Sequence, residues 1–289
     1  MVDASRRNSG SDDTGAMHLF QLVPGALAHD YSVCLGRASS EEGGFCTCRC
    51  GRVFPPVQGV RCTSPGFGEA PFGSSITLCF AFTQGAKDIA ASAPALAAEA
   101  LGKLRCCVRR VLHTAGQSGY ECQEDEGAFM LAFESAGDVV RFAASLQQEL
   151  PKLPWPDDLR VLRPNFSQGL RMSVGALSGS YTSRRPHTST GRADYFGTIV
   201  NRTARIAAAA HPGQVLLGGE APLAPTSRMK SESSSAPDGI ALERLGAFAL
   251  KGIDAPMVLH ELRLQKDDGS FEVFPEPKTK GRVADEPQK

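Results

Sequence analysis

The chain has 289 residues, of which 42% are hydrophobic and 21% are charged, the balance of an ordinary globular protein. Its 31 lysine and arginine residues equal its 31 aspartate and glutamate residues, so net charge gives no reason to expect nucleic acid or an acidic membrane surface as a partner. No apolar run reaches the roughly 20 residues that span a bilayer, and residues 17–28 lack the design of a signal peptide. We therefore expect a soluble, intracellular chain without a membrane span of its own, or a part of a larger membrane-associated protein.

The first 73 residues show little periodicity and divide into two parts. Residues 1–16 are polar and rich in Gly, Ser and Asp, so we expect them to be disordered. Residues 17–73 form a Cys/Gly/Pro-rich extension in which Cys46, Cys48 and Cys50 alternate. Zinc sites usually pair cysteines at Cys-x2–4-Cys spacing, so this pattern is a poor match, and whether the cysteines bind a metal stays open.

A sharper pattern begins at residue 74. The predicted elements of the first half are a strand over 76–82, helical segments over 87–115, strands over 120–123 and 128–133, and a helix over 135–150. Ser135 precedes Asp138 by three residues, as at the start of a capped helix. Four cysteines fall within these elements, and we expect them to be small buried hydrophobes: Cys79, Cys106, Cys107 and Cys122.

The second half continues with a strand over 170–177, a polar loop, and a unit over 194–217 that is predicted as loop, helix and buried strand. A Pro/Ser-rich loop insertion over 218–238 and a closing strand pair over 241–250 and 257–264 follow, and residues 265–289 are predicted to be a disordered tail. One domain therefore covers residues 74–264. Its order of elements, β-α-β-β-α-β, predicts an α+β, ferredoxin-like fold.

Within 194–217, Asn201 and Arg205 are four residues apart and so share one face of the predicted helix. A carboxamide one turn from a guanidinium is a suitable clamp for a phosphoryl or ribose group. The packing face is predicted to carry small apolar side chains: Val200, Ala204, Ala207 and Ala208. From spacing alone, the alternative is a solvated polar face on an ordinary helix.

The run D-Y-F-G-T-I-V-N-R-T-A-R at 194–205, followed by G-Q-V-L at 213–216, resembles the class III adenylyl/guanylyl cyclase catalytic domain. Residues 119–133 resemble the family's central hairpin, 75–85 its first strand and 250–262 its last two strands. The resemblance covers roughly residues 74–264. It implies a nucleotidyl cyclase domain that binds ATP or a related nucleotide and works as a dimer with sites at the interface.

Family members hold two metal ions with two aspartates, and the resemblance aligns these positions with Phe82 and Gly127. Neither side chain can ligate Mg²⁺ or Mn²⁺, so we expect these metals only if a partner's aspartates supply them, and none bound by this chain alone. A shifted turn that presents Asp125 or Glu126 is the alternative, although Asp88 lies too far along the chain to replace Phe82.

The sequence retains more of the family residues that contact the substrate than of those that bind metal. The resemblance implies that Asp194 accepts a hydrogen bond from the adenine amino group and that Asn201 orients the ribose. It also implies that Arg205 stabilises charge on the transferring phosphate.

Three basic residues of the family pattern are replaced. The base-recognition lysine falls at Gln123, which can still form hydrogen bonds. The late phosphate lysine falls at Ile253, and Lys251 on the same strand face is the candidate substitute, against the alternative of an exposed strand lysine. The family arginine falls at Ser173, and Arg171 on the same strand face is its candidate substitute.

Together these positions favour a degenerate, C2-like half that donates Asn201 and Arg205 to a metal-bearing cyclase domain in a heterodimer and is inactive alone. Its role would be cyclic nucleotide synthesis in signalling. The alternative is a catalytically inactive pseudo-cyclase that serves as a scaffold or nucleotide-binding module. An active homodimer that uses Asp125 or Glu126 is a third interpretation.

Overall fold

The computed structural model describes residues 67–113, 119–162, 169–188, 190–219, 239–266 and 268–283, together with 46–47 and 53–54. The predictions for residues 1–16, for most of 17–66 and for 220–238 lie outside the described residues. In the part of the chain that is described, no helix is both long and apolar enough to cross a bilayer.

The helical elements are α2 (Ala86–Ser92), α3 (Pro94–Leu112), α4 (Ala136–Glu149), α5 (Asp158–Leu162) and α6 (Thr198–Ala209), with the short 3-10 turns η1 (Phe67–Glu69) and η2 (Leu150–Lys152). The strands are β1 (Cys46–Thr47), β2 (Val53–Phe54), β3 (Ile76–Thr83), β4 (Gly119–Asp125), β5 (Ala128–Phe133), β6 (Met172–Gly179), β7 (Ser183–Pro186), β8 (Ala193–Phe196), β9 (Val215–Gly218), β10 (Ile240–Phe248), β11 (Met257–Leu264) and β12 (Arg282–Val283).

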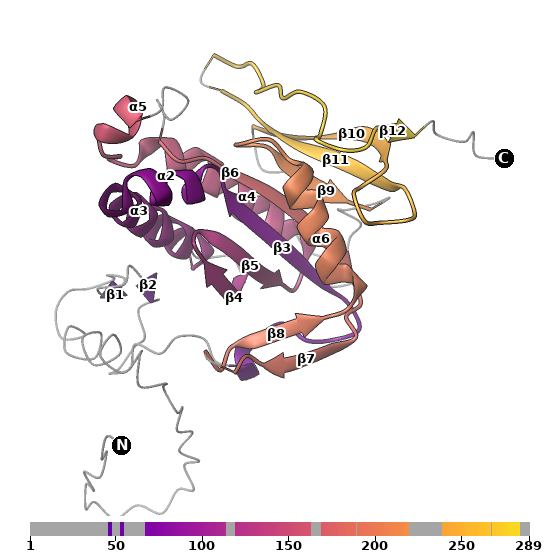
Figure 1. Ribbon diagram of the computed structural model, residues 1–289. Coiled ribbons are helices and arrows are strands. Elements are labelled where there is room, and N and C mark those ends of the chain that lie inside the picture. The colour runs from indigo at the N-terminus through magenta and orange to yellow at the C-terminus, as the bar shows by residue number, and fades with distance from the viewer. Residues whose placement is uncertain are drawn as a thin grey trace, which may run out of the picture.

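One eight-stranded sheet forms the centre of the domain, in the order β12-β10-β11-β9-β6-β3-β5-β4. β6 and β9 are parallel, and the other neighbouring pairs are antiparallel. The strands β6-β3-β5-β4 and the helices between them make the predicted ferredoxin-like β-α-β-β-α-β arrangement, which is confirmed. β7 and β8 form a separate two-stranded ribbon at one end of the sheet (Figure 1).

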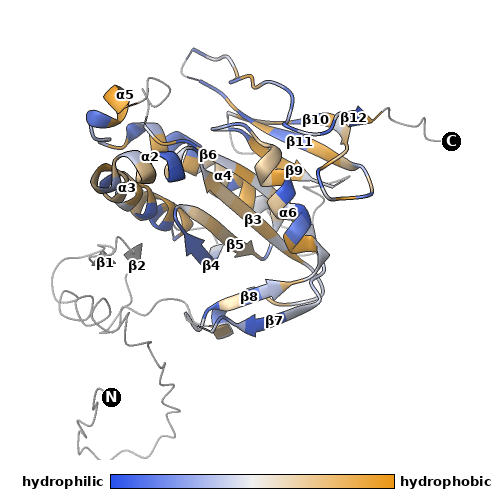
Figure 2. Cartoon of the chain, in the orientation of Figure 1, coloured by the Kyte–Doolittle hydropathy of each residue, from blue (hydrophilic) through white to orange (hydrophobic). Residues whose placement is uncertain are grey.

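Helices cover both faces of this sheet. α3 and α4 pack on one face, and α6 crosses the other (Figure 1). On β3, Cys79 and Ala81 pack toward α3 and α4, whereas Ile76 and Leu78 pack toward the β7–β8 ribbon. Because both of its faces are covered, β3 is apolar along its length, as its hydrophobic colouring in Figure 2 shows against the hydrophilic β7.

The start of α4 follows the sequence prediction. The Ser135 hydroxyl accepts a hydrogen bond from the Asp138 backbone N–H at 3.2 Å and so caps the first turn. Three of the cysteines predicted to be small buried hydrophobes are buried, namely Cys79, Cys107 and Cys122, and Cys106 is half-buried.

Helix α6 lies directly on β6. A Cβ built on Gly175 would lie 2.1 Å from the backbone nitrogen of Ala207, so this approach requires glycine. The predicted packing face is wrong in part, because Ala208 is exposed and Thr203 is fully buried. Thr203 can be buried because its hydroxyl donates to the carbonyl of Ile199 at 2.7 Å.

The domain extends beyond both of its predicted boundaries. Ala70 is buried and the carbonyl of Pro71 accepts a hydrogen bond from the Tyr195 hydroxyl, so the packed structure begins before residue 74. The prediction of a disordered tail from residue 265 is wrong for residues 268–283, which we call the C-terminal segment. Its β12 pairs with β10, so main-chain pairing with an edge strand orders a segment whose composition is typical of disorder.

Candidate active site

The outer face of α6 carries the Asn/Arg pair. Asn201 and Arg205 are both exposed and lie one turn apart, so the predicted shared face is present. A Cβ built on Gly252 would lie 3.8 Å from Nε and Nη2 of Arg205, which places this guanidinium beside the turn between β10 and β11. The structure therefore brings α6 and that turn to one place on the sheet.

Lys251 lies in this turn and not on a strand, which corrects the prediction. The Ile253 backbone N–H donates to the carbonyl of Leu250 at 3.2 Å, and Gly252 has a φ of 77°, so residues 250–253 close a tight turn. Lys251 is exposed at its tip, next to the loop position that faces Arg205. Ile253 packs instead against the apolar cluster beneath α6.

Asp194 lies on β8 beside the edge strand β4. The backbone N–H of the preceding residue, Ala193, donates to the Tyr120 hydroxyl on β4 at 2.9 Å, so Asp194 lies close to β4. A β-bulge lies between Glu121 and Gln123, and it sets Gln123 opposite Met130. Met130 belongs to the apolar cluster that also includes Ala193 and Tyr195, the two neighbours of Asp194, so Gln123 lies on the side of the sheet against which β8 packs.

A cavity of about 430 Å³ lies where β3 ends against the β4–β5 turn. Its lining includes Phe82, Asp88, Asp125 and Glu126. Glu126 and Gly127 form the two-residue turn with φ values of 48° and 81°, and Glu126 is a non-glycine residue in the left-handed region. The predicted register, with Phe82 on β3 next to this turn, is what the structure contains.

Neither Phe82 nor Gly127, at this end of β3, carries a side-chain oxygen that could bind a divalent metal. Phe82 contributes an aromatic ring that lies 5.8 Å from that of Phe80, and Gly127 has no ligating atom in its side chain. Throughout the described ranges, no group of three or more His, Cys, Asp or Glu residues is placed to hold a metal ion. Glu126 lies instead 3.7 Å from the ammonium group of Lys87, and both side chains are exposed.

Arg171 is placed away from the α6 outer face. Its Nη2 pairs with Oε1 of Glu272 at 2.8 Å, and its guanidinium lies 6.0 Å from the ring centroid of Phe274. Both partners belong to the C-terminal segment, so Arg171 fastens that segment to β6 and the expectation that it reaches the nucleotide is not supported. Ser173, the residue that the resemblance aligns with a family arginine, is fully buried. Its hydroxyl accepts a hydrogen bond from the Gln84 side chain at 2.9 Å.

A buried cluster of charges behind the site was missed from the sequence. Arg109 of α3 donates to both carboxylate oxygens of Glu121, at 2.7 and 2.8 Å, and Arg192 lies 2.7 Å from the same carboxylate. Burial would raise the pKa of Glu121, but the charges of Arg192 and Arg109 outweigh it and lower the pKa to about 2. The signal available in the sequence was a glutamate between the apolar residues Tyr120 and Cys122.

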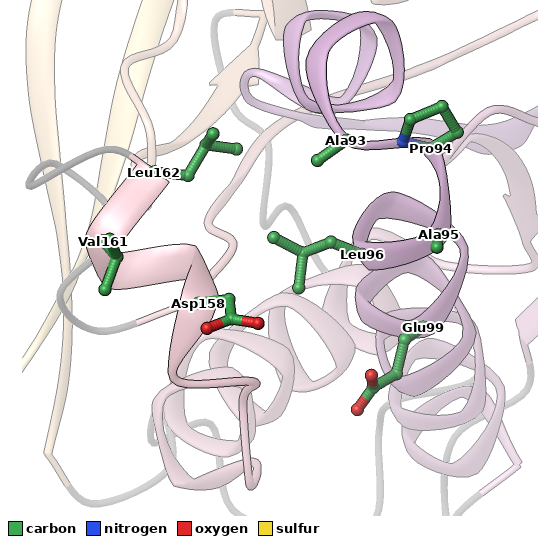
Figure 3. Close-up of a pocket in the computed structure, with 8 residues that line it drawn as sticks. All are labelled: Ala93, Pro94, Ala95, Leu96, Glu99, Asp158, Val161 and Leu162. Atoms are coloured by element: carbon green, nitrogen blue, oxygen red, sulfur yellow. The ribbon is translucent and has the colours of Figure 1, made fainter.

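A second, larger cavity of about 740 Å³ lies between α3 and α5 (Figure 3). Leu96, Val161 and Leu162 line its apolar part, and the carboxylates of Glu99 and Asp158 lie at one end (Figure 3). None of the residues that line it belongs to α6, to β8 or to the end of β3, where the candidate substrate residues lie. The cavity at the end of β3 and the outer face of α6 are therefore the better candidate site.

No protein-family model matches the chain. Among curated proteins, the adenylate cyclase of Schizosaccharomyces pombe is 28% identical in an alignment of 171 residues that covers 51% of this chain and 10% of that protein. The adenylate cyclase of Mycosarcoma maydis is 32% identical in an alignment of 118 residues that covers 38% of this chain and 5% of that protein. The chain thus spans a tenth or less of the length of these relatives.

Solved structures match over most of the described domain. Two structures of Trypanosoma brucei adenylate cyclases in their monomeric state have TM-scores of 0.58 at 22% and 23% identity, covering 73% and 75% of this chain and 98% of each of theirs. The guanylate cyclase domain of RhGC from Catenaria anguillulae, solved in complex with GTP, has a TM-score of 0.50 at 15% identity, covering 67% of this chain and 98% of that one. At these identities the likeness establishes the fold.

Proposed function

Because the described domain has the fold of the class III adenylyl/guanylyl cyclase catalytic domains, we propose that this chain is a C2-like half of a nucleotidyl cyclase. It would supply Asn201, Arg205 and Asp194 to a site shared with a second, metal-bearing cyclase domain. The observation that carries the proposal is the exposed Asn201/Arg205 face on α6, together with Phe82, a residue without a metal-ligating atom, at the end of β3.

Each residue has a chemical role in this proposal. When the ribose 3′-hydroxyl attacks the α-phosphate, negative charge develops on the phosphoryl oxygens, and the Arg205 guanidinium can stabilise it. Asn201 would orient the ribose through its amide, which lowers the entropic cost of reaching the reactive geometry. The metal ions that this transfer needs would come with the partner's carboxylates.

Selection of the base would depend on β8 and β4. Asp194 can accept a hydrogen bond from the exocyclic amine of adenine, and Gln123, on the side of the sheet against which β8 packs, can add a second hydrogen bond. We expect ATP to bind more tightly than GTP, because guanine presents a carbonyl oxygen that a carboxylate repels.

The second candidate is a pseudo-cyclase that acts as a scaffold or nucleotide-binding module without turnover. It is favoured by the replacement of two basic positions by Gln123 and Ile253, since an uncharged side chain holds a triphosphate less tightly. Partly exposed Phe80 and Phe82 also offer an apolar surface to a partner.

The test is an assay of cyclase activity with Mn²⁺ and ATP. The chain is assayed alone and mixed with a related cyclase domain that keeps its metal aspartates but has its Asn/Arg pair replaced. We expect activity only in the mixture, with a loss of about 100-fold or more for Asn201→Ala or Arg205→Ala. Arg202→Ala is the matched control, because Arg202 is an exposed arginine on the same helix.

Each other outcome selects a different function. A silent mixture whose two domains are shown to associate would favour the scaffold. Activity of the chain alone would mean that Asp125 or Glu126 supports catalysis without a partner.

A further inference from the structure

The strand that carries Asp194 is not part of the main sheet. β8 pairs with β7 in a separate two-stranded ribbon, whereas Gln123 lies on β4, the edge strand of the eight-stranded sheet. No ladder of main-chain hydrogen bonds therefore sets the distance between these two residues within the described strands. Side-chain contacts must hold the ribbon against the sheet edge.

Two such contacts flank Asp194 on its N-terminal side. The Tyr120 hydroxyl accepts a hydrogen bond from the Ala193 backbone N–H at 2.9 Å. Nη1 of Arg192 lies 2.7 Å from Oε1 of Glu121 and also donates to the Glu121 main-chain carbonyl at 3.4 Å. Both partners are on β4, one and two residues before the bulge that presents Gln123.

The Glu121 carboxylate is itself fixed from the opposite face of the sheet. Arg109 on α3 holds it in a two-pronged contact, and the side chains of Arg109, Glu121 and Arg192 are 4%, 7% and 11% exposed. Arg109 also lies 3.8 Å from Glu124, which is paired with Arg105 at 2.9 Å. A rigid, dehydrated carboxylate of this kind directs an arginine far more specifically than an exposed one does.

Stability alone is a poor explanation for this cluster. A buried ion pair is often no more stabilising than apolar residues of the same volume, because dehydration of the charges offsets their attraction. One arginine would suffice to pair Glu121, yet the second is Arg192, which directly precedes β8 and lies two residues before Asp194. The position of the second arginine points to a role in geometry.

We propose that Glu121, held by Arg109, is a positioning residue that fixes β8 against β4 through Arg192, so that Asp194 and Gln123 face the same nucleotide base. The proposal rests on the proposed function, because base reading by Asp194 belongs to that function. It adds that adenine selectivity depends on a carboxylate that does not touch the base.

The key variant is Arg192→Gln. It removes the ion pair between Arg192 and Glu121. The Glu121 carboxylate stays paired with Arg109, so its charge remains neutralised. Arg110→Gln is the matched control, because Arg110 is an ion-paired arginine on α3 whose partner is Glu149 at 3.0 Å. Arg192→Lys keeps the positive charge but loses the planar guanidinium group. It tests whether charge alone restores part of the contact with Glu121.

The first measurement is hydrogen exchange of the free chain, followed at the β8 amides. We expect exchange at Ala193 to become at least about ten-fold faster in Arg192→Gln, with β3 and β5 unchanged, and no change at β8 in Arg110→Gln. Unchanged exchange at β8 in Arg192→Gln would overturn the proposal.

The second measurement is the ratio of the dissociation constants for ATP and GTP, made on the chain mixed with the metal-bearing cyclase domain of the activity assay. We expect Arg192→Gln to weaken ATP about ten-fold, to leave GTP nearly unchanged, and Arg192→Lys to lie between. An equal loss for both nucleotides would indicate a merely structural role and overturn the proposal. If the mixture that contains the wild-type chain binds neither nucleotide, the proposed function fails and base positioning fails with it. The exchange rates of the free chain still report whether Glu121 fixes the ribbon.

Discussion

At the scale of single residues, Glu121 shows how a carboxylate stays charged inside a protein. Dehydration favours its neutral form, and two guanidinium groups reverse that preference. The ordinary pKa of 4.5 falls to about 2, so folding gains from ionised Glu121 at every pH above about 4.5.

This shift predicts an acid-sensitive stability. As pH falls from about 4.5 toward 2, the unfolded chain takes up a proton that the folded chain refuses, and the free energy of unfolding should drop by on the order of 3 kcal/mol. Urea unfolding of the wild-type chain at several pH values measures the drop. Glu121→Gln should be less stable at pH 6, because it leaves two arginines incompletely paired, and should show a flatter pH dependence below 4.5.

The control for this prediction is Glu149→Gln. Glu149 pairs with Arg110 and Lys152 at the surface, where ion pairs contribute little, so its variant should follow the wild-type curve. If the free energy of unfolding of Glu121→Gln falls as steeply between pH 4.5 and 2 as that of the wild type, the pH dependence does not come from Glu121.

At the scale of elements, the position of the Asn/Arg pair is set by how closely α6 approaches β6. The contact runs through Gly175, where any side chain would meet the backbone of α6. The absence of a side chain at Gly175 therefore sets the distance between the sheet and the helix that presents Asn201 and Arg205.

We predict that Gly175→Ala displaces α6 and destabilises the fold by about 1–3 kcal/mol, since backbone must move to admit the methyl group. Gly102→Ala is the matched control: Gly102 lies inside α3 with nothing within 4 Å of a built Cβ, so alanine should stabilise by about 0.5–1 kcal/mol through helix propensity. Thermal unfolding measures both. Equal effects of the two substitutions would show that the α6 contact is looser than described.

At the scale of the whole molecule, the sequence predicted what depends on local order. Strand periodicity gave the central β-α-β-β-α-β arrangement, and four-residue spacing placed Asn201 and Arg205 on one helix face. It failed where partners are distant along the chain. Arg192 and Glu121 are 71 residues apart, and Arg171 and Glu272 are 101 apart, so no local pattern could pair them.

The C-terminal segment is the largest of these long-range features. From Glu272, which pairs with Arg171, the chain runs past the end of α6, where the Lys278 backbone N–H donates to the Ala209 carbonyl at 2.7 Å. It then pairs with β10, the strand that would otherwise form the sheet edge. One segment thus joins β6, α6 and β10.

Deletion of residues 268–289 should therefore weaken the whole domain and not only its end. Losing an ion pair, the packing of Phe274 and the cover of β10 should cost about 2 kcal/mol, which lowers the melting temperature by roughly 4–8 °C in a domain of this size. The uncovered β10 edge should also promote self-association, measurable by light scattering. Glu272→Gln, which removes only the ion pair, should lower the melting temperature by no more than about 2 °C. A deletion with the same small effect would mean that the C-terminal segment is held by that pair alone and does not support α6.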